Sequence, residues 1–257
     1  MKSANQSDIQ KAFTQQAAGF ESTRMNFTKK DYLDYAVRKI SPTESDEVLE
    51  VAAGTCVCGR AIAPFVEHVT CLDMTPAMLA VGQAEAEKAH LNNMTFLQGD
   101  AAELPFPAER FSIVLSRLAF HHFPDVNLPF AEMVRVLKPG GKLVLIDMAA
   151  PGETLRSRKD DIERLRDPSH IRCLTQTEMC ALYRDAGLNI PCCDMVSMPT
   201  KLQNWLDHTA TPTAIQSQIR QAMQSELSGG EKTGFAPYDC CGELTFDQHW
   251  VLVIGTK

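Results

Sequence analysis

The sequence predicts an α/β protein with a Rossmann-like, doubly wound and mostly parallel sheet of seven strands, a helical N-terminal cap and a C-terminal lid insertion. Short apolar runs alternate with helical stretches over residues 46–150, and two further apolar runs follow near the C-terminus. Strands separated by helices of this length need right-handed crossovers, which cover both faces of a parallel sheet. A glycine turn after the first strand and acids after the next two fit the same architecture.

The composition is typical of a soluble globular chain. The 257 residues are 44% hydrophobic and 22% charged, which is enough apolar material for a buried core and argues against disorder. No run approaches the roughly 18 apolar residues that a membrane helix needs. The net charge of -7 disfavours a non-specific nucleic-acid binder. The N-terminus lacks the apolar region of a secretory signal, so we expect a cytoplasmic protein with no integral membrane segment.

The chain carries an unusual number of cysteines. An odd number in an unexported chain indicates reduced thiols, and no Cys-x-x-Cys spacing occurs. We therefore predict no metal, and interpret most of these thiols as small buried apolar side chains, although the two adjacent pairs could still meet in space. The nine are Cys56, Cys58, Cys71, Cys173, Cys180, Cys192, Cys193, Cys240 and Cys241.

The first half of the chain divides into a cap and a core. Apolar residues at helical spacing over 1–40 predict a cap, assigned to residues 1–45, and the core follows at 46–150. The first predicted strand is Val48–Ala52. The other core strands are predicted at 69–72, 94–97, 112–116 and 142–146, and the main core helices at 76–90 and 126–137.

The second half, residues 151–257, is predicted to complete the sheet. Helices are expected at 153–167, 175–187 and 212–227, and strands at 190–197 and 250–254. Residues 199–240 then form an insertion between two sheet strands. Insertions at the edge of an α/β sheet commonly build a lid over a site, and we assign this one that role.

The turn after the first strand resembles a nucleotide-binding loop. Gly54 and Gly59 take the first and third glycine positions of a G-x-G-x-x-G pattern, and Cys56 takes the second. Glycine there permits a tight turn and close approach of a ligand. A side chain at the middle position crowds a pyrophosphate, so Cys56 disfavours a dinucleotide. A tight turn without a ligand is the alternative.

Acidic residues follow the next two strands. Asp73 lies nineteen residues after Gly54, where a carboxylate accepts hydrogen bonds from ribose hydroxyls. Asp100 follows the third strand and can meet an adenine amino group, with an ordinary surface turn as the alternative. Together these residues indicate a ligand that contains a nucleoside.

Five ordered motifs over about 95 residues resemble those of class I S-adenosylmethionine-dependent methyltransferases. Within that class, the motifs resemble most the small-molecule group that includes the C-methyltransferases of ubiquinone and menaquinone biosynthesis. The segment 165–172 also resembles a feature of a bacterial subgroup. The motifs are Val48–Thr55, Leu72–Leu79, Gln98–Phe106, Ser116–Phe123 and Arg135–Gly141.

The resemblance implies S-adenosyl-L-methionine as cofactor and S-adenosyl-L-homocysteine as product. It implies cofactor contacts at Glu50, Ala52, Gly54, Asp73, Met74, Asp100, Ala101 and Arg117. Two positions depart from the family pattern: Cys56 replaces a glycine, which could shift the methionine end, and Phe20 replaces a tyrosine. We predict that Asp73→Ala abolishes cofactor binding with the fold intact, because its partner is expected to be the ligand.

Methyl transfer from a sulfonium mainly requires alignment and exclusion of water. His121 and His122 follow the fourth strand and are the candidate bases, with shaping of the loop as the alternative. His170 and Arg172 are candidates for binding an acidic or phenolic acceptor, or else for capping neighbouring helices with Asp167.

The favoured function is methylation of a small-molecule acceptor, with no nucleic-acid partner and with a homodimer left open. A catalytically silent S-adenosylmethionine-binding module is the first alternative. A nicotinamide-dependent oxidoreductase is the second, and Cys56 disfavours it. The sequence names neither the acceptor nor the element that receives the methyl group.

Overall fold

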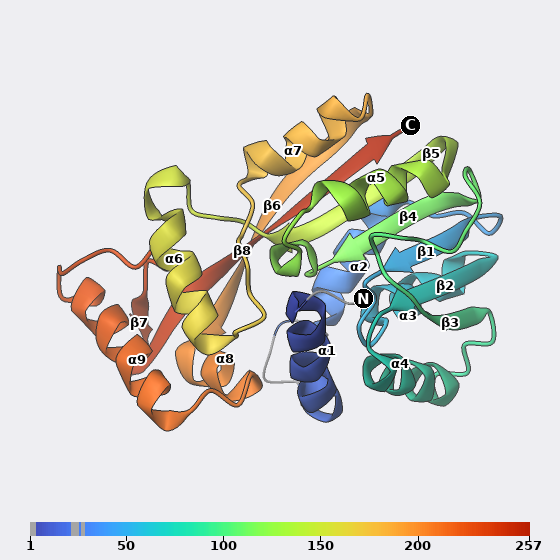
Figure 1. Cartoon of the computed structure of the whole chain (residues 1–257). Helices are drawn as coiled ribbons and strands as arrows, with labels where there is room; N and C mark the ends of the chain where they lie inside the picture. The colour runs from blue at the N-terminus through green and yellow to red at the C-terminus, as the bar shows by residue number, and fades with distance from the viewer. Residues whose placement is uncertain (1–3, 22–25, 27–28) are drawn as a thin grey trace.

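The computed structural model describes residues 4–21, 26 and 29–257. Within these residues eight strands form one sheet in the order β3-β2-β1-β4-β5-β8-β6, and β7 pairs with β8 (Figure 1). The core strands are parallel, whereas β8 runs antiparallel to β5 and β6. The strands are β1 (Glu47–Val51), β2 (His68–Asp73), β3 (Met94–Gln98), β4 (Phe111–Arg117), β5 (Leu137–Met148), β6 (Asn189–Lys201), β7 (Tyr238–Cys240) and β8 (Glu243–Thr256).

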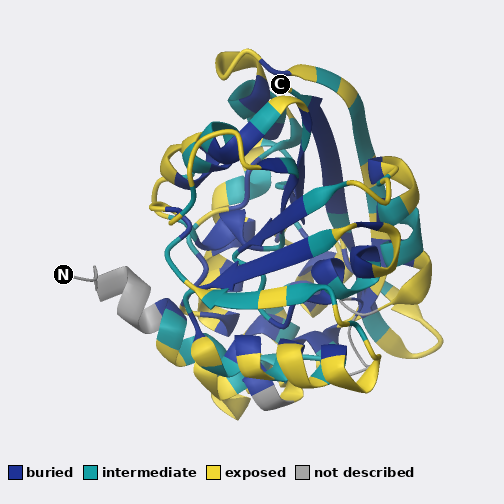
Figure 2. Cartoon of the chain, turned by 90° about the vertical axis from the view of Figure 1, so that its right-hand side faces the viewer, coloured by how far each residue is buried: buried dark blue, intermediate teal, exposed yellow. Residues whose placement is uncertain are grey.

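Helices cover both faces of the sheet, as the doubly wound prediction requires. Alternate strand residues point to opposite faces, so Val48 joins the cluster under α2, α3 and α4, and Leu49 joins the cluster under α5 and α7. Figure 2 shows the central strands buried and the outer helices exposed. The α-helices are α1 (Ala4–Gln16), α2 (Lys30–Ile40), α3 (Val57–Ile62), α4 (Pro76–Lys88), α5 (Asn127–Val136), α6 (Glu153–Arg166), α7 (Gln176–Asp185), α8 (Leu202–His208) and α9 (Thr213–Leu227), with short 3-10 turns η1 (Ala17–Gly19), η3 (Ala63–Phe65) and η4 (Phe120–His122).

The predicted insertion at 199–240 is part of a larger lobe. That insertion holds α8, α9 and β7, but a separate apolar cluster also takes Ile162 from α6 and Phe246 from the start of β8. Helices α6, α8 and α9 and strand β7 therefore form one lobe, seen on the left of Figure 1. We call α6, α8, α9, β7 and the first half of β8 the lid lobe.

The last two long strands differ most from prediction. The apolar runs predict 190–197 and 250–254, whereas β6 and β8 pair from Asn189↔Thr256 to Lys201↔Thr245, with one register shift between Asn189 and Cys192. Only the second half of β8 is buried on both faces, so only that half is a continuous apolar run.

No helix of the described residues is long and apolar enough to cross a membrane.

Candidate active site

The loop after β1 turns sharply over the carboxyl edge of the sheet. Ala52, Gly54 and Cys56 all have positive φ, at 52°, 55° and 59°. Two of these are not glycine, and such conformations persist only where their surroundings hold them. Here the Ala53 N–H donates to the Leu72 carbonyl at 3.0 Å, which ties the loop to β2.

The Cys56 side chain points away from the pocket. It is fully buried, and a Cβ added at Gly82 of α4 would lie 2.9 Å from its sulfur and 2.7 Å from the Thr55 carbonyl oxygen. The absent side chain at Gly82 therefore lets α4 pack directly on the loop. The structure gives no support to the expectation that Cys56 crowds a pyrophosphate, because its thiol occupies the interface between the loop and α4.

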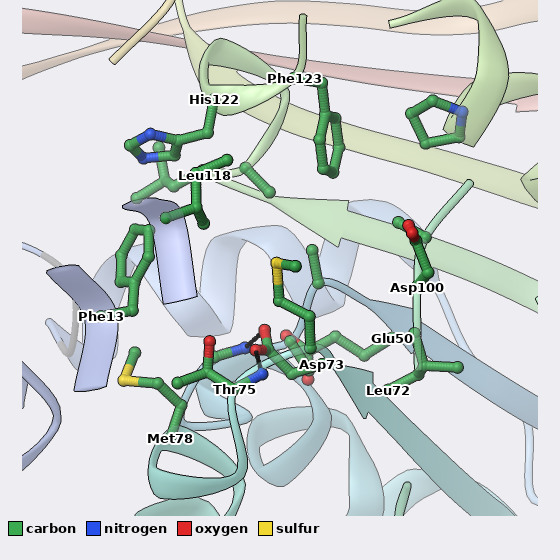
Figure 3. A pocket seen from close by; sticks show the side chains of 18 of the residues that line it. Phe13, Glu50, Leu72, Asp73, Thr75, Met78, Asp100, Leu118, His122 and Phe123 are labelled. Atoms are coloured by element: carbon green, nitrogen blue, oxygen red, sulfur yellow. Dashed lines mark hydrogen bonds between the residues drawn. The ribbon is translucent and has the colours of Figure 1, made fainter. Parts of the chain in front are cut away.

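A pocket of about 270 Å³ opens at the carboxyl ends of β1, β2 and β4, beside the loop after β3 (Figure 3). The structure brings all the predicted cofactor residues to its lining. These are Glu50, Ala52, Gly54, Asp73, Met74, Asp100, Ala101 and Arg117. They come from four separate segments, so the pocket exists only in the folded chain.

Asp73 lies at the centre of the pocket floor and is already bonded to the chain. Its carboxylate accepts hydrogen bonds from the N–H groups of Gly54 and Thr75, each at 2.7 Å. This corrects the expectation that its partner is a ligand alone, and Asp73→Ala must loosen the loop as well. Burial raises the Asp73 pKa, opposed by these two N–H groups. The Thr75 side chain also hydrogen-bonds to this carboxylate and opposes the rise in its pKa, and since a carboxylate offers about four acceptor positions, capacity remains for a ligand hydroxyl group.

Glu50 lies beneath the loop, 2% exposed. Its Oε2 accepts a hydrogen bond from the Gly59 N–H at 2.7 Å. Burial raises its pKa to about 7, although that N–H and the Arg117 charge oppose the change. The Arg117 guanidinium stacks 5.2 Å from the Trp250 ring. The floor therefore contains a carboxyl that titrates near neutral pH.

The far end of the pocket combines a carboxylate with apolar walls. Asp100 accepts a hydrogen bond from the Ala102 N–H at 2.9 Å, which fixes its side chain at the loop after β3. Leu72, Met74 and Phe123 line the same pocket, and Figure 3 shows Asp100 across from Phe123. An apolar slot with an acid at its edge suits a flat heterocycle with an amino group.

His122 lies at the opposite end, on η4. Its Nδ1 is 3.0 Å from the Ser169 carbonyl oxygen, and because a carbonyl only accepts, Nδ1 carries the hydrogen and Nε2 keeps its lone pair. Burial and the neighbouring His121 charge lower the His122 pKa to about 3. His122 is therefore neutral at pH 7.

His121 is held differently. The ring Nδ1 of His121 lies 2.6 Å from Asp147 Oδ1, and the backbone N–H of His121 donates to Asp147 Oδ2 at 3.2 Å. Burial lowers the His121 pKa, but the Asp147 charge and hydrogen bond outweigh this and the net shift is upward. Unlike His122, His121 does not line the large pocket.

A second, smaller cavity of about 40 Å³ adjoins the first. Four residues line both: Phe13, Phe20, Leu118 and His122. Its other walls come from the cap, from the end of α6, from α8 and from the sheet. They are Gln16, His121, Met148, Arg166, Asp167, Trp205, His208, Thr209 and Gln248. We call it the cap–lid cavity. Sequence reasoning missed Trp205 and His208, which no motif marks, and it did not single out Arg166 within the segment 165–172.

The structure does not bring His170 and Arg172 to either cavity. His170 is 1% exposed with Nε2 2.8 Å from Asp160 Oδ1, and Arg172 pairs with Glu178 at 3.2 Å. The Ile171 and Arg172 N–H groups instead donate to the His121 carbonyl. This segment holds the η4 loop in place, and it gives no support to direct acceptor binding by these two side chains.

One group of side chains among the described residues could hold a metal ion. The potential ligand atoms of Asp160, His170 and Cys173 lie within 4.8 Å of one another. Asp160 Oδ1 already accepts hydrogen bonds from His170 Nε2 and from the Cys173 N–H at 3.0 Å. These bonds account for the arrangement by tying the segment after α6 to that helix. The adjacent cysteine pairs lie on β6 and on the exposed β7–β8 turn.

Comparison with known proteins gives consistent results. Residues 49–145 match a family described as a methyltransferase domain. The uncharacterized methyltransferase YcgJ of Bacillus subtilis is 31% identical over 194 residues, 75% of this chain and 77% of that protein. A demethylmenaquinone methyltransferase of Listeria welshimeri is 39% identical over 107 residues, 40% of this chain and 45% of that protein.

Solved structures agree. The YcgJ structure from Bacillus subtilis has a TM-score of 0.81 at 28% identity and covers 89% of this chain and 99% of its own. A methyltransferase structure from Bacillus halodurans has a TM-score of 0.80 at 28% identity, covering 88% and 99%. The ordered motifs, the sheet order and these relatives agree, and the chain belongs to the family of S-adenosylmethionine-dependent methyltransferases.

Proposed function

We propose that the chain binds S-adenosylmethionine in the large pocket and transfers its methyl group to a small-molecule acceptor that enters between the cap and the lid lobe. One observation carries the proposal. Asp73 and Asp100 lie on the floor and at the far end of the same pocket that Gly54 lines. That order matches the ribose and adenine parts of the cofactor.

The residues present fit such a ligand. Gly54 lines the pocket at φ 55°, a left-handed conformation that favours glycine, and without a side chain it leaves room for a ligand to approach the backbone. Thr55 Oγ1 is buried without a hydrogen-bond partner among the described residues, and Thr55 also lines the pocket. A polar ligand group there would satisfy that hydroxyl.

When bound, S-adenosylmethionine supplies a sulfonium methyl group, and transfer forms a bond from the acceptor to that carbon as the carbon–sulfur bond breaks. The chain contributes position and a dry environment. Glu50 would lie beneath the positively charged methionine end, where its ionised form is favoured. Phe13, Leu118 and His122 would surround the transfer point and keep water out.

His122 is proposed to orient the acceptor through Nε2. A group with a pKa lowered to about 3 is a poor general base, because its affinity for a proton lies far below the operating pH. It can still accept a hydrogen bond from a hydroxyl or amino group. His121, bonded to Asp147, would hold the loop that carries it.

The test combines binding and turnover. Calorimetry with S-adenosylhomocysteine is expected to show one site per chain, with no competition from nicotinamide dinucleotides. Methyl-labelled S-adenosylmethionine and a panel of small acceptors are then expected to give labelled product. Binding without any product across the panel would favour a catalytically silent module, and tighter binding of a nicotinamide dinucleotide would contradict the proposal.

A further inference from the structure

We infer that the cap–lid cavity receives an anionic oxygen of the acceptor, so that the acceptor is a planar ring compound carrying a carboxylate or an ionised hydroxyl. The inference rests on the proposed methyl transfer and names the class of its acceptor. It depends on the position of the cavity, on two buried donors, on the cavity's size and on its charge.

The position of the cavity is the first step. Phe13, Leu118 and His122 line both cavities, so a molecule that spans the two lies across the proposed transfer point. Figure 3 shows these three side chains together at one end of the large pocket. The cap–lid cavity is therefore placed to hold one end of an acceptor whose other end is methylated.

The second step concerns Arg166 and Trp205. The guanidinium stacks 4.4 Å from the Trp205 ring centroid, and its Nη2 lies 3.2 Å from Glu163 Oε2. Arg166 Nε and Trp205 Nε1 are both buried without a hydrogen-bond partner among the described residues. Buried donors are nearly always satisfied, and oxygen atoms of a bound acceptor would satisfy both.

Size limits what can enter. A volume of about 40 Å³ holds roughly three water-sized groups. A carboxylate or a single oxyanion fits, but an aromatic ring does not. The ring would lie in the gap shared with the large pocket, where Phe13 meets His122 edge-on at 5.1 Å. Aromatic walls of this kind favour a planar ligand.

Charge favours an anion over an amine. Asp167 is the one carboxylate among the described lining residues, and its Oδ1 accepts hydrogen bonds from the Ser169 N–H and Oγ at 3.0 and 2.6 Å. Burial and the Arg166 charge lower the pKa of His208 to about 4, so this ring is neutral at pH 7. Arg166 is therefore the guanidinium that faces this cavity: its Nη2 pairs with Glu163, and its Nε is the charged donor left to meet a ligand oxygen, which an amine cannot supply.

Binding of simple probes to the full chain, saturated with S-adenosylhomocysteine, tests the inference. Ligand-detected NMR titrations would compare benzoate and 4-nitrophenolate with neutral benzamide and cationic benzylamine. Because a hydrogen bond to a charged group contributes substantially, one or both anions should bind at least about tenfold more tightly than benzamide. Preference for the carboxylate or for the phenolate identifies the source of the oxyanion.

Variants then locate the site. Arg166→Gln should weaken anion binding at least about tenfold, whereas Arg158→Gln, at an exposed arginine on the same helix, should not. If Arg166→Gln unfolds, Arg166→Lys is tested in its place because it keeps a positive charge beside Glu163. Trp205→Phe keeps an aromatic ring but removes the indole N–H donor. Both should bind the anion several-fold more weakly.

Equal binding of all four probes, preference for benzylamine, or unchanged binding in folded Arg166→Lys and Trp205→Phe would each overturn the inference. The proposed function fails separately, if S-adenosylhomocysteine does not bind by calorimetry. Arg166-dependent anion binding without S-adenosylhomocysteine binding would retain the anion site but reject the methyl-transfer role.

Discussion

The large pocket and the cap–lid cavity are adjacent but built on different principles. The pocket lies on loops at the carboxyl ends of parallel strands, and its carboxylates accept hydrogen bonds from nearby backbone N–H groups, as Asp73 does from Gly54. The cap–lid cavity is assembled from α1, α6, α8 and β8, and Arg166 and Trp205 keep donors without partners there.

We infer from this difference that cofactor binding and acceptor choice are built into separate parts of the chain. A pocket fixed by backbone bonds presents the same groups whatever the rest of the chain does. A cavity between a cap and a lid changes with any residue on several helices, which suits the choice of acceptor. The predictions below ask whether the two regions can be altered independently.

The largest effect is expected at Asp73. Asp73→Ala removes the proposed ribose contact and also two hydrogen bonds to backbone N–H groups. Since each bond to a charged group contributes about 1.5–3 kcal/mol, affinity for S-adenosylhomocysteine should fall at least about 100-fold and the unfolding temperature should fall too. Calorimetry and thermal unfolding measure both, with Asp73→Asn as the isosteric control. Undiminished affinity would remove the ribose assignment.

The lid lobe should lose stability without loss of cofactor affinity. Leu206 is fully buried in the lobe's apolar cluster, so Leu206→Ala should cost about 2–5 kcal/mol of unfolding free energy. Leu227→Ala, at an exposed leucine of the same lobe, should cost far less. Affinity for S-adenosylhomocysteine should change less than about twofold, because the lobe contributes no side chain to the large pocket's lining. A parallel loss of affinity would show that the regions are coupled.

Glu50 should make cofactor binding depend on pH. Its pKa is raised from 4.5 to about 7, so between pH 4.5 and pH 7 the folded chain holds a proton that the unfolded chain has released. The free energy of unfolding without cofactor therefore falls as the pH rises through this range. A cationic ligand favours the ionised form. Affinity for S-adenosylmethionine should therefore rise about tenfold from pH 6 to pH 8.

The control for this pH dependence is Glu50→Gln, which keeps the shape of the side chain but cannot ionise. Calorimetry at several pH values should give a nearly flat profile for the variant. A wild-type profile as flat as the variant's would show that the Glu50 carboxyl does not respond to the ligand's charge.

The smallest effect is expected at Cys56. Cys56→Gly stabilises the fold by relieving a positive φ and destabilises it by removing a buried thiol. Because these two effects oppose each other, the free energy of unfolding should change by no more than about 1 kcal/mol. Cofactor affinity should stay within about threefold, because the thiol faces α4. A change above tenfold in calorimetry would mean that Cys56 reaches the ligand after all.

The sequence predicts the pocket better than the cavity for a physical reason. Gly54, Asp73 and Asp100 follow successive strands of one parallel sheet, so local periodicity is enough to bring them to one edge. Arg166 and Trp205 meet only because α6 and α8 pack on the same apolar cluster. No short-range pattern encodes that packing.

The same reason explains the error at His170. His170 and Arg172 form a polar cluster in the sequence, but the backbone of this segment bonds to the His121 carbonyl and the His170 ring lies against Asp160. Likewise the first half of β8 alternates polar and apolar residues and was not predicted as sheet, because only its pairing with β6 defines it.

The most direct test of the two-region account is a crystal structure with S-adenosylhomocysteine bound. The account predicts adenine beside Asp100, ribose hydroxyls on Asp73, and the sulfur facing the gap between Phe13, Leu118 and His122, with the cap–lid cavity left free. Bound S-adenosylhomocysteine that extends past His122 to Arg166, or that makes no contact with Asp73, would contradict this prediction.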